Sequence, residues 1–297
     1  MRMVHRIAAL VLLFKLALMP ANAAETLTGS WSIQPQSRPE RVDFLVRIED
    51  NDRHSTDETS TDFDLAELGL NDASLRTDGS KITIALARDG GSIAGSGIVT
   101  HGTASGSFVF TPSAAYRTAM RERGYPGLSA RDQLRATMEN ISLAFVDEIA
   151  SAGYRQLPFD ELLAFRGLRI DGAYIAAARA TFPSSTLDAN LLVQLAALRV
   201  TQAFVTEFRA EGFAVERPAD AVQLRAMNID RGFVHDLAAA GFAHLSLGEL
   251  IQLRALGIDG TYIKRVESHG IARPTVDQLM RLRAMNIVRS APVAVTS

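Results

Sequence analysis

The spacing of apolar residues changes once along the chain, near residue 112. From Leu27 to about Thr111, apolar and polar residues alternate, as in strands with one buried face. The alternation predicts strands at 27–33, 41–48, 81–87, 92–100 and 104–110. Asp89-Gly90-Gly91 and His101-Gly102 are turn sequences. We therefore expect the last three strands to form an antiparallel meander.

The segment between the second and third predicted strands is polar and acidic. It lacks the alternation, so we predict a loop over residues 49–64. Its carboxylates could gather calcium: Glu49, Asp50, Asp52, Asp57, Asp62 and Asp64. The loop lacks the glycine and the closing glutamate of an EF-hand, which favours a solvated acidic loop. Residues 24–112 contain 14 acidic and 7 basic residues, a net charge of −7.

After residue 112 the chain repeats itself. In each repeat a polar residue precedes an aromatic residue by three positions, and successive repeats are 29, 29, 30, 29 and 29 residues apart. The polar residues, which begin units 1 to 6, are Ser113, Ser142, Asp171, Thr201, Asp230 and Asp259. All are good helix N-caps, because their side-chain oxygens accept hydrogen bonds from first-turn amides. The pattern predicts a helix start in every unit.

Apolar residues and glycines support these helices. Five units carry an apolar residue just before the cap and another four positions after it, which is a hydrophobic staple. The residues before the cap are Ile141, Ile170, Val200, Ile229 and Ile258. All first helices except the third end at a glycine: Gly124, Gly153, Gly212, Gly241 and Gly270. Glycine permits the left-handed conformation that closes a helix.

A second helix follows in each unit. Ser246-x-x-Glu249 and Thr275-x-x-Gln278 are capping boxes, and Ser129-x-x-Asp132 is a looser version. Such short helices require neighbours to bury their apolar stripes. The predicted fold is therefore α+β: an antiparallel β domain over residues 24–112, then an α-solenoid of six two-helix repeats over 113–287, and a flexible C-terminal tail over 288–297.

The repeats resemble a known kind of bacterial module. Residues 144–171, AFVDEIASAGYRQLPFDELLAFRGLRID, and residues 232–259, GFVHDLAAAGFAHLSLGELIQLRALGID, carry the resemblance. They are similar to helical repeats in exported extensions of membrane metallopeptidases like the β-lactam-sensing antirepressors, and in stand-alone exported proteins. The resemblance covers the repeats and, more weakly, the β region. It implies a bacterial, extracytoplasmic sensing or interaction module, and it brings no catalytic residues because the peptidase zinc motif is absent.

The first residues predict export. A basic start, an apolar run from Ile7 to Leu18 and the small-x-small sequence Ala21-Asn22-Ala23 are typical of a signal peptide over residues 1–23. The apolar run is too short to span a bilayer, which needs about 20 residues. We expect a periplasmic or extracellular protein without stable membrane insertion after cleavage near Ala23.

Composition narrows the chemistry. The chain has 31 basic and 33 acidic residues, a balance that argues against an electrostatic nucleic-acid binder. The absence of cysteine excludes disulfides and thiolate metal sites. No H-E-x-x-H, P-loop or nucleophile-elbow motif occurs, and no two histidines are three or four residues apart. We expect no cofactor, no metal and no catalytic residue.

One repeated charge stands out. An arginine occupies the same position of the second helix in four units: Arg166, Arg225, Arg254 and Arg283, hereafter the arginine row. These residues are candidates for a partner-binding face, because arginine presents a planar fork of donors. Alternatively, they are framework residues that pair with a carboxylate or with a helix C-terminus.

Two functions follow as hypotheses. The first is an exported, non-catalytic interaction or sensing module, whose solenoid surface binds a protein or another envelope component. The second is a small-ligand-binding or hydrolytic protein with a site in the β domain or at the domain junction.

Overall fold

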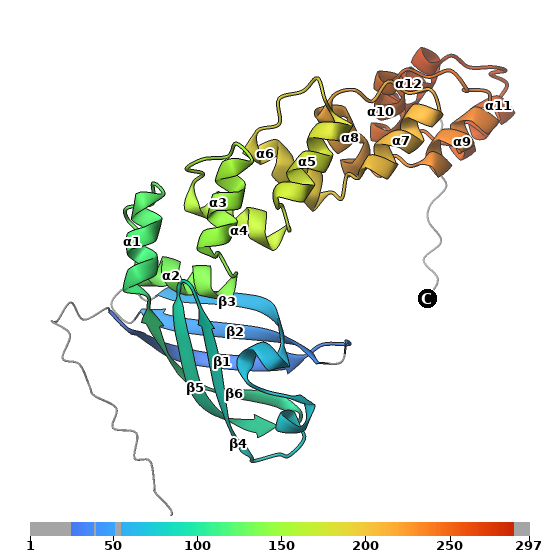
Figure 1. Cartoon of the computed structure of the whole chain (residues 1–297). Coiled ribbons are helices and arrows are strands. Elements are labelled where there is room, and N and C mark those ends of the chain that lie inside the picture. Colours follow the sequence, from blue (N-terminus) through green and yellow to red (C-terminus); the bar gives the residue numbers. More distant parts are fainter. Residues whose placement is uncertain (1–24, 39, 51–54, 288–297) are drawn as a thin grey trace, which may run out of the picture.

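The computed structural model describes residues 25–38, 40–50 and 55–287. The predicted signal peptide, its cleavage sequence and the predicted tail lie outside the described residues, as do Asn51, Asp52 and His54. The described chain is an antiparallel sheet followed by twelve helices, and the helical array extends away from the sheet as an arm (Figure 1). The α+β prediction is confirmed.

The sheet has six strands in the order β3-β2-β1-β6-β5-β4, and every neighbouring pair is antiparallel. Their bounds are Leu27–Pro35 (β1), Arg41–Asp50 (β2), Ser55–Asp64 (β3), Lys81–Arg88 (β4), Gly91–Thr100 (β5) and Thr103–Pro112 (β6). Two short 3-10 helices, η1 (Leu65–Leu68) and η2 (Asp72–Leu75), connect β3 to β4. The predicted meander of the last three strands is confirmed.

The predicted loop over residues 49–64 is wrong, because residues Ser55–Asp64 form the edge strand β3. Its backbone pairs with β2 along the whole register, from Arg41 opposite Asp64 to Asp50 opposite Ser55. On the outer face, Arg47 donates to Glu58 over 2.7 Å. Ladder hydrogen bonds need no apolar alternation, and charged side chains are common on edge strands because they discourage further pairing. The acidic pattern therefore marked an edge strand.

The alternating apolar residues of the sheet form one buried cluster. Trp31 lies at its centre, 1% exposed, and its indole Nε1 donates to the Ser107 carbonyl over 3.1 Å. Gly97 lies against the indole, and a Cβ there would come within 2.6 Å of the Trp31 ring. This close approach requires glycine. The cluster also includes Leu134 and Met138, which belong to the second helix of the array.

In the part of the chain that the structure describes, twelve helices follow β6. The first helices of units 1 to 6 are α1 (Ala114–Glu122), α3 (Leu143–Ser151), α5 (Gly172–Thr181), α7 (Gln202–Ala210), α9 (Arg231–Ala239) and α11 (Gly260–Ser268). The second helices are α2 (Ala130–Met138), α4 (Phe159–Gly167), α6 (Ala189–Ala197), α8 (Pro218–Ala226), α10 (Leu247–Ala255) and α12 (Val276–Ala284).

The predicted caps are confirmed in all six units. Each cap side chain accepts a hydrogen bond from the backbone N–H of the aromatic residue three positions later. The capping boxes that begin at Ser129, Ser246 and Thr275 are also formed. The five closing glycines have positive φ angles. Local sequence therefore determines where each helix of the array begins and where five of the first helices end.

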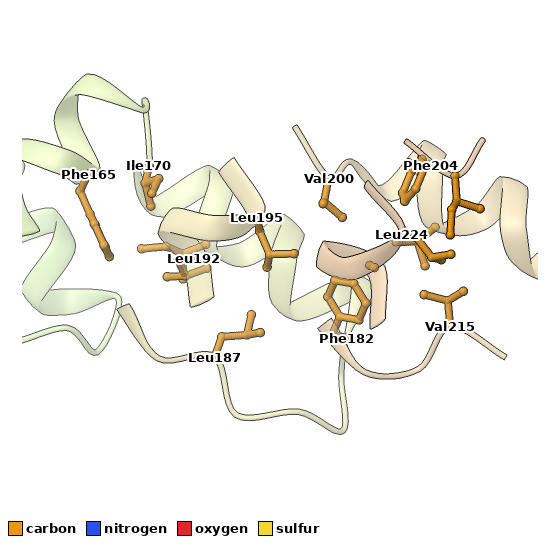
Figure 2. Packing of buried hydrophobic residues seen from close by; sticks show 14 of the residues in the cluster. Phe165, Ile170, Phe182, Leu187, Leu192, Leu195, Val200, Phe204, Val215 and Leu224 are labelled. Carbon is orange, nitrogen blue, oxygen red and sulfur yellow. The ribbon is translucent and has the colours of Figure 1, made fainter. Parts of the chain in front are cut away.

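The array buries a continuous apolar core between successive units, part of which Figure 2 shows. Four of the five staple residues before the caps are at most 1% exposed, and Val200 is 8% exposed. Among the described residues, no single helix is long and apolar enough to cross a membrane; α6 and α7 reach such a length and apolar composition only together, and they are bent by 78° where they meet.

Candidate functional site

A polar cleft lies where the sheet meets the first two units of the array. Its volume is about 640 Å³, and its walls come from β2, β3, η1, β4 and the segment from the end of α2 to the cap of α5. We call it the junction cleft. Its charged lining residues are Arg41, Asp62, Glu67, Arg88, Glu139, Arg166, Arg169 and Asp171. Both domains therefore contribute charge to one open site.

Arg88 fixes the end of α2 against the sheet. Its guanidinium donates to the carbonyls of Thr137 over 2.8 Å and Met138 over 2.7 Å. It also pairs with Glu67 at 2.6 Å and lies over the Phe63 ring, 4.8 Å from the centroid. A cation near the last carbonyls of a helix is stabilised by the helix dipole. Arg88 therefore anchors the floor of the cleft.

The edge strand β3 makes a second link to α2. The Thr61 hydroxyl donates to the Glu139 side chain over 2.7 Å. Farther along the strand, Asp57 pairs with Arg131 near the start of α2. The segment predicted to be a loop thus holds the helix on the sheet and positions one wall of the cleft.

The β4–β5 turn positions the next helix. An Asp89 side-chain oxygen accepts from the Leu143 N–H, 2.9 Å away, in the first turn of α3. Glu148 does the same for Gly172 in α5, and Asp236 for Gly260 in α11. The β domain therefore supplies to unit 2 a contact that two later units receive from a preceding repeat.

Tyr116 links the first helix of unit 1 to the residue just before the cap of unit 2. Its hydroxyl donates to the Ile141 carbonyl over 2.8 Å, and the side chain is 2% exposed. Burial first, and then the charge of Asp89, raise the pKa of Tyr116 well above its ordinary range. Both causes favour the protonated hydroxyl, which is the form that donates to the Ile141 carbonyl.

The carboxylates of the cleft are already engaged. Asp62 lies 3.7 Å from Arg41 and Glu67 pairs with Arg88, while Asp171 caps α5 by accepting from Tyr174 over 2.8 Å. By contrast, Arg169 is exposed and no carboxylate of the described residues pairs with it. The cleft therefore offers an unneutralised guanidinium to a binding partner.

The arginine row has the same geometry at each of its members. Each guanidinium Nε donates to the carbonyl of the C-cap residue, directly after the second helix of the preceding unit, at 2.8 to 3.3 Å. Each also lies over the aromatic ring of its own unit's first helix, 4.9 to 5.4 Å from the centroid. The pairs are Arg166 with Glu139 and Phe145, Arg225 with Leu198 and Phe204, Arg254 with Met227 and Phe233, and Arg283 with Leu256 and Tyr262.

These contacts give the row a framework role between units. The sequence left open pairing with a carboxylate or a helix C-terminus, and the structure has the helix C-terminus. Arg166 differs from the other three because it also lines the junction cleft. Recognition of a partner by the row is still a prediction.

The described residues contain no candidate metal site. There, no group of three or more His, Asp or Glu side chains could hold a metal ion. The acidic residues considered for calcium are distributed along β2 and β3, except those in the undescribed segment 51–54.

Sequence reasoning missed five charged residues of the cleft, namely Arg41, Glu67, Arg88, Glu139 and Arg169. Arg88 and Glu139 carry no local signal, because their partners lie far away along the chain. Arg169 carries one: it follows the end of α4 with a φ of 59°, and Asn140 and Asn228 occupy the same position in other units. Non-glycine residues at positive φ are uncommon, and asparagine adopts this region most readily. A non-glycine, non-asparagine residue at this position could have been noticed from this alignment, both here and at Arg199 in unit 3.

Comparison of the chain with protein-family models, with curated proteins and with solved structures found no match.

Proposed function

We propose that this protein is an exported, non-catalytic interaction module. It binds a protein or another envelope component in the junction cleft and along the adjoining face of the helical array. The proposal rests on Arg166, which both lines the cleft and is the first member of the arginine row. A partner seated in the cleft would meet the array directly beside it.

The lining of the cleft supports an extended partner. Eight of its fifteen lining residues are charged. Sites for small molecules are usually apolar with a few polar groups, whereas the rims of protein interfaces are polar and open to solvent. The unpaired Arg169 favours a partner that brings a carboxylate or another anionic group, because a guanidinium binds such groups through two parallel hydrogen bonds.

The second hypothesis is a small-ligand or hydrolytic site at the same junction. The volume of about 640 Å³ is within the range of ligand sites and keeps this alternative open. It differs from the first in what it predicts: a small anionic ligand would be held inside the cleft by Arg169 and Arg41, without contacts to units 3 to 6 of the array.

Export rests on residues 1–23 and is part of the proposal. Sequencing the N-terminus of the exported form tests it. A start at Ala24 supports cleavage, whereas a retained Met1 on a membrane-bound product contradicts it.

Partner binding is tested by affinity capture from envelope extract with the processed protein and two matched variants. Arg169→Asn removes the charge and keeps the left-handed backbone, since asparagine occupies this position in units 1 and 4. We expect the captured component to be lost or much reduced. Arg199→Asn changes the equivalent residue of the next unit, which does not line the cleft, and should retain it. Equal capture by all three proteins would contradict a site in the cleft.

A further inference from the structure

Arginine side chains in this protein repeat one mode of contact. Among the described residues, six guanidinium groups lie over an aromatic ring, and each of the six also donates to a carbonyl at the end of a helix. Besides the four members of the arginine row, they are Arg88, over Phe63, and Arg179, over Tyr154. Arg179 donates to the Ala152 carbonyl over 2.7 Å. An aromatic ring beside a carbonyl at the end of a helix is therefore the arrangement that binds a guanidinium group in this protein.

Unit 3 has the ring and the carbonyl but lacks the arginine. In α6 the position of the arginine row is Ala196, two residues before the C-cap residue Leu198, as Arg225 is two residues before the C-cap residue Met227. The carbonyl that corresponds to those of the other units belongs to Leu168, the C-cap residue of α4, and the ring belongs to Tyr174. We call Leu168, Tyr174 and Ala196 the row gap.

The row gap is uncovered where the other units are covered. The corresponding aromatic residues of the other five units, Tyr116, Phe145, Phe204, Phe233 and Tyr262, are 2 to 7% exposed. Tyr174 is only partly buried. No side chain of the described residues donates to the Leu168 carbonyl, and none places a cation over the Tyr174 ring. Both groups that bind guanidinium elsewhere in the array are therefore available here.

The neighbouring seam between units 3 and 4 is also less tightly linked. Ala177 occupies the position of Glu148 and Asp236, so the first-turn amide of Gln202 lacks the carboxylate contact of units 3 and 6. A cavity of about 190 Å³ lies beside Tyr174, lined mainly by apolar side chains. The apolar core nevertheless continues through this seam, where Leu195 and Val200 pack toward unit 4 (Figure 2).

We propose that the row gap binds an arginine side chain presented by a protein partner. The guanidinium stacks on Tyr174 and donates to the Leu168 carbonyl, as the chain's own arginines do in units 2, 4, 5 and 6. A lysine does not replace it, because an ammonium group has no planar face to stack on the ring while its donors reach the carbonyl. The partner class rests on the proposed interaction function, but the preference for guanidinium does not.

The test uses a small probe and the full chain. The chain has five tyrosines, so ¹³C-labelled tyrosine resolves Tyr174 by NMR. With N-acetyl-arginine amide, we expect a saturable shift of the Tyr174 ring signals. N-acetyl-lysine amide, which has the same charge, should give no saturable shift. Tyr116 and Tyr262, whose rings are buried, should not respond to either probe.

Two variants decide the location. Ala196→Arg should fill the gap with the chain's own guanidinium and abolish the response of Tyr174. Ala197→Arg adds the same charge at the exposed neighbouring position and should preserve it. If circular dichroism shows that Ala196→Arg does not fold, Tyr174→Leu replaces it. The shift caused by N-acetyl-arginine amide is then read at the Arg169 amide, and it should be present in the wild type and lost in Tyr174→Leu.

Equal shifts with the two probes, a shift that survives Ala196→Arg, or no shift with either probe would overturn the proposal. Failure of the capture experiment at Arg169 leaves these results unaffected. Conversely, a positive capture with no probe response keeps the interaction function and removes the row gap from it.

Discussion

The two regions of this protein are held together over different distances along the chain. In the β domain, the first strand pairs with the last, with Leu27 opposite Phe110, and the Trp31 indole bonds to Ser107. In the array, the cap of each first helix joins residues three apart, and the arginine row joins neighbouring units only. Long-range pairing makes the β domain one cooperative body, whereas nearest-neighbour contacts let an array loosen unit by unit.

The difference can be measured because the chain contains one tryptophan, and it lies in the β core. Trp31 fluorescence therefore follows the sheet, while circular dichroism at helical wavelengths follows the array. These two signals distinguish unfolding of the sheet from unfolding of the array.

The largest effect is expected from Phe44→Ala. Phe44 is fully buried and packs against Trp31 and, edge to face, against Phe63. Removing a buried phenylalanine costs about 3–5 kcal/mol. We expect the Trp31 transition in urea to shift strongly to lower concentration, while the helical transition changes less.

Leu253→Ala is the counterpart in the array, since Leu253 is also fully buried. The loss of about 2–5 kcal/mol should loosen units 4 to 6 and leave the Trp31 transition in place. Coincident shifts of both signals in both variants would mean that sheet and array unfold as one body, a result that the packing of α2 on the sheet would then explain.

A smaller effect is expected from Arg254→Met. The substitution keeps an apolar stem over Phe233 but removes the bond to the Met227 carbonyl and the cation over the ring. The loss should be about 1–2 kcal/mol, the usual scale of such contacts. It should appear in the helical transition only. Arg155→Met is the control, since Arg155 is exposed and takes part in no such pairing. A loss of similar size there would show that the row contributes nothing specific.

The same contrast of distances explains which features the sequence could predict. The caps at Ser113 and Asp230 each depend on residues within one turn, so their pattern was sufficient to place α1 and α9. β3 escaped prediction because its pairing partner, rather than its own pattern, makes it a strand. Its inward positions Thr59 and Thr61 are only partly buried, which removes the apolar alternation.

The junction cleft could not be predicted for the same reason. It exists because α2 docks on the sheet through Arg88 and Thr61, and neither contact leaves a periodic signal. The arginine row was visible as a repeat, but its role depends on the distance from each guanidinium to a carbonyl in the preceding unit, which no spacing specifies. The absence of an arginine at Ala196 likewise indicates a candidate guanidinium site only when the contacts of the other row members are known.

Substitution of a cap residue tests whether each helix of the array is stabilised by contacts within its own first turn. Asp230 accepts from the Phe233 N–H over 2.9 Å, so Asp230→Ala should cost about 1 kcal/mol. Hydrogen exchange should quicken from Arg231 to Gly241 and stay unchanged in the sheet. Asp230→Asn retains an acceptor of similar capping strength and should restore protection. Uniform loss of protection across both regions would count against a local cap.

The smallest effect is expected on lowering the pH, and it should differ between units 5 and 6. Hydrogen bonds from the Ser246 N–H, and then from its hydroxyl, hold the pKa of Glu249 below its ordinary value of 4.5. A carboxyl whose pKa is lower when folded stabilises the protein above the ordinary value, and this contribution disappears as the pH falls through the folded pKa. The protection of the first-turn amides of α10 should therefore decline as the pH drops below about 4.5.

Unit 6 contains a matched comparison, because Gln278 forms the same capping box with Thr275 and does not titrate in this range. Protection at the start of α12, corrected for intrinsic exchange, should therefore be flat over the same pH interval, whatever its absolute level. Glu249→Gln should make α10 behave like α12, because the amide oxygen can still accept from the Ser246 N–H. If α10 loses protection equally in the wild type and in Glu249→Gln, the acid sensitivity comes from contacts between units. The stability of α10 would then depend less on its own capping box than the hydrogen bonds of that box indicate.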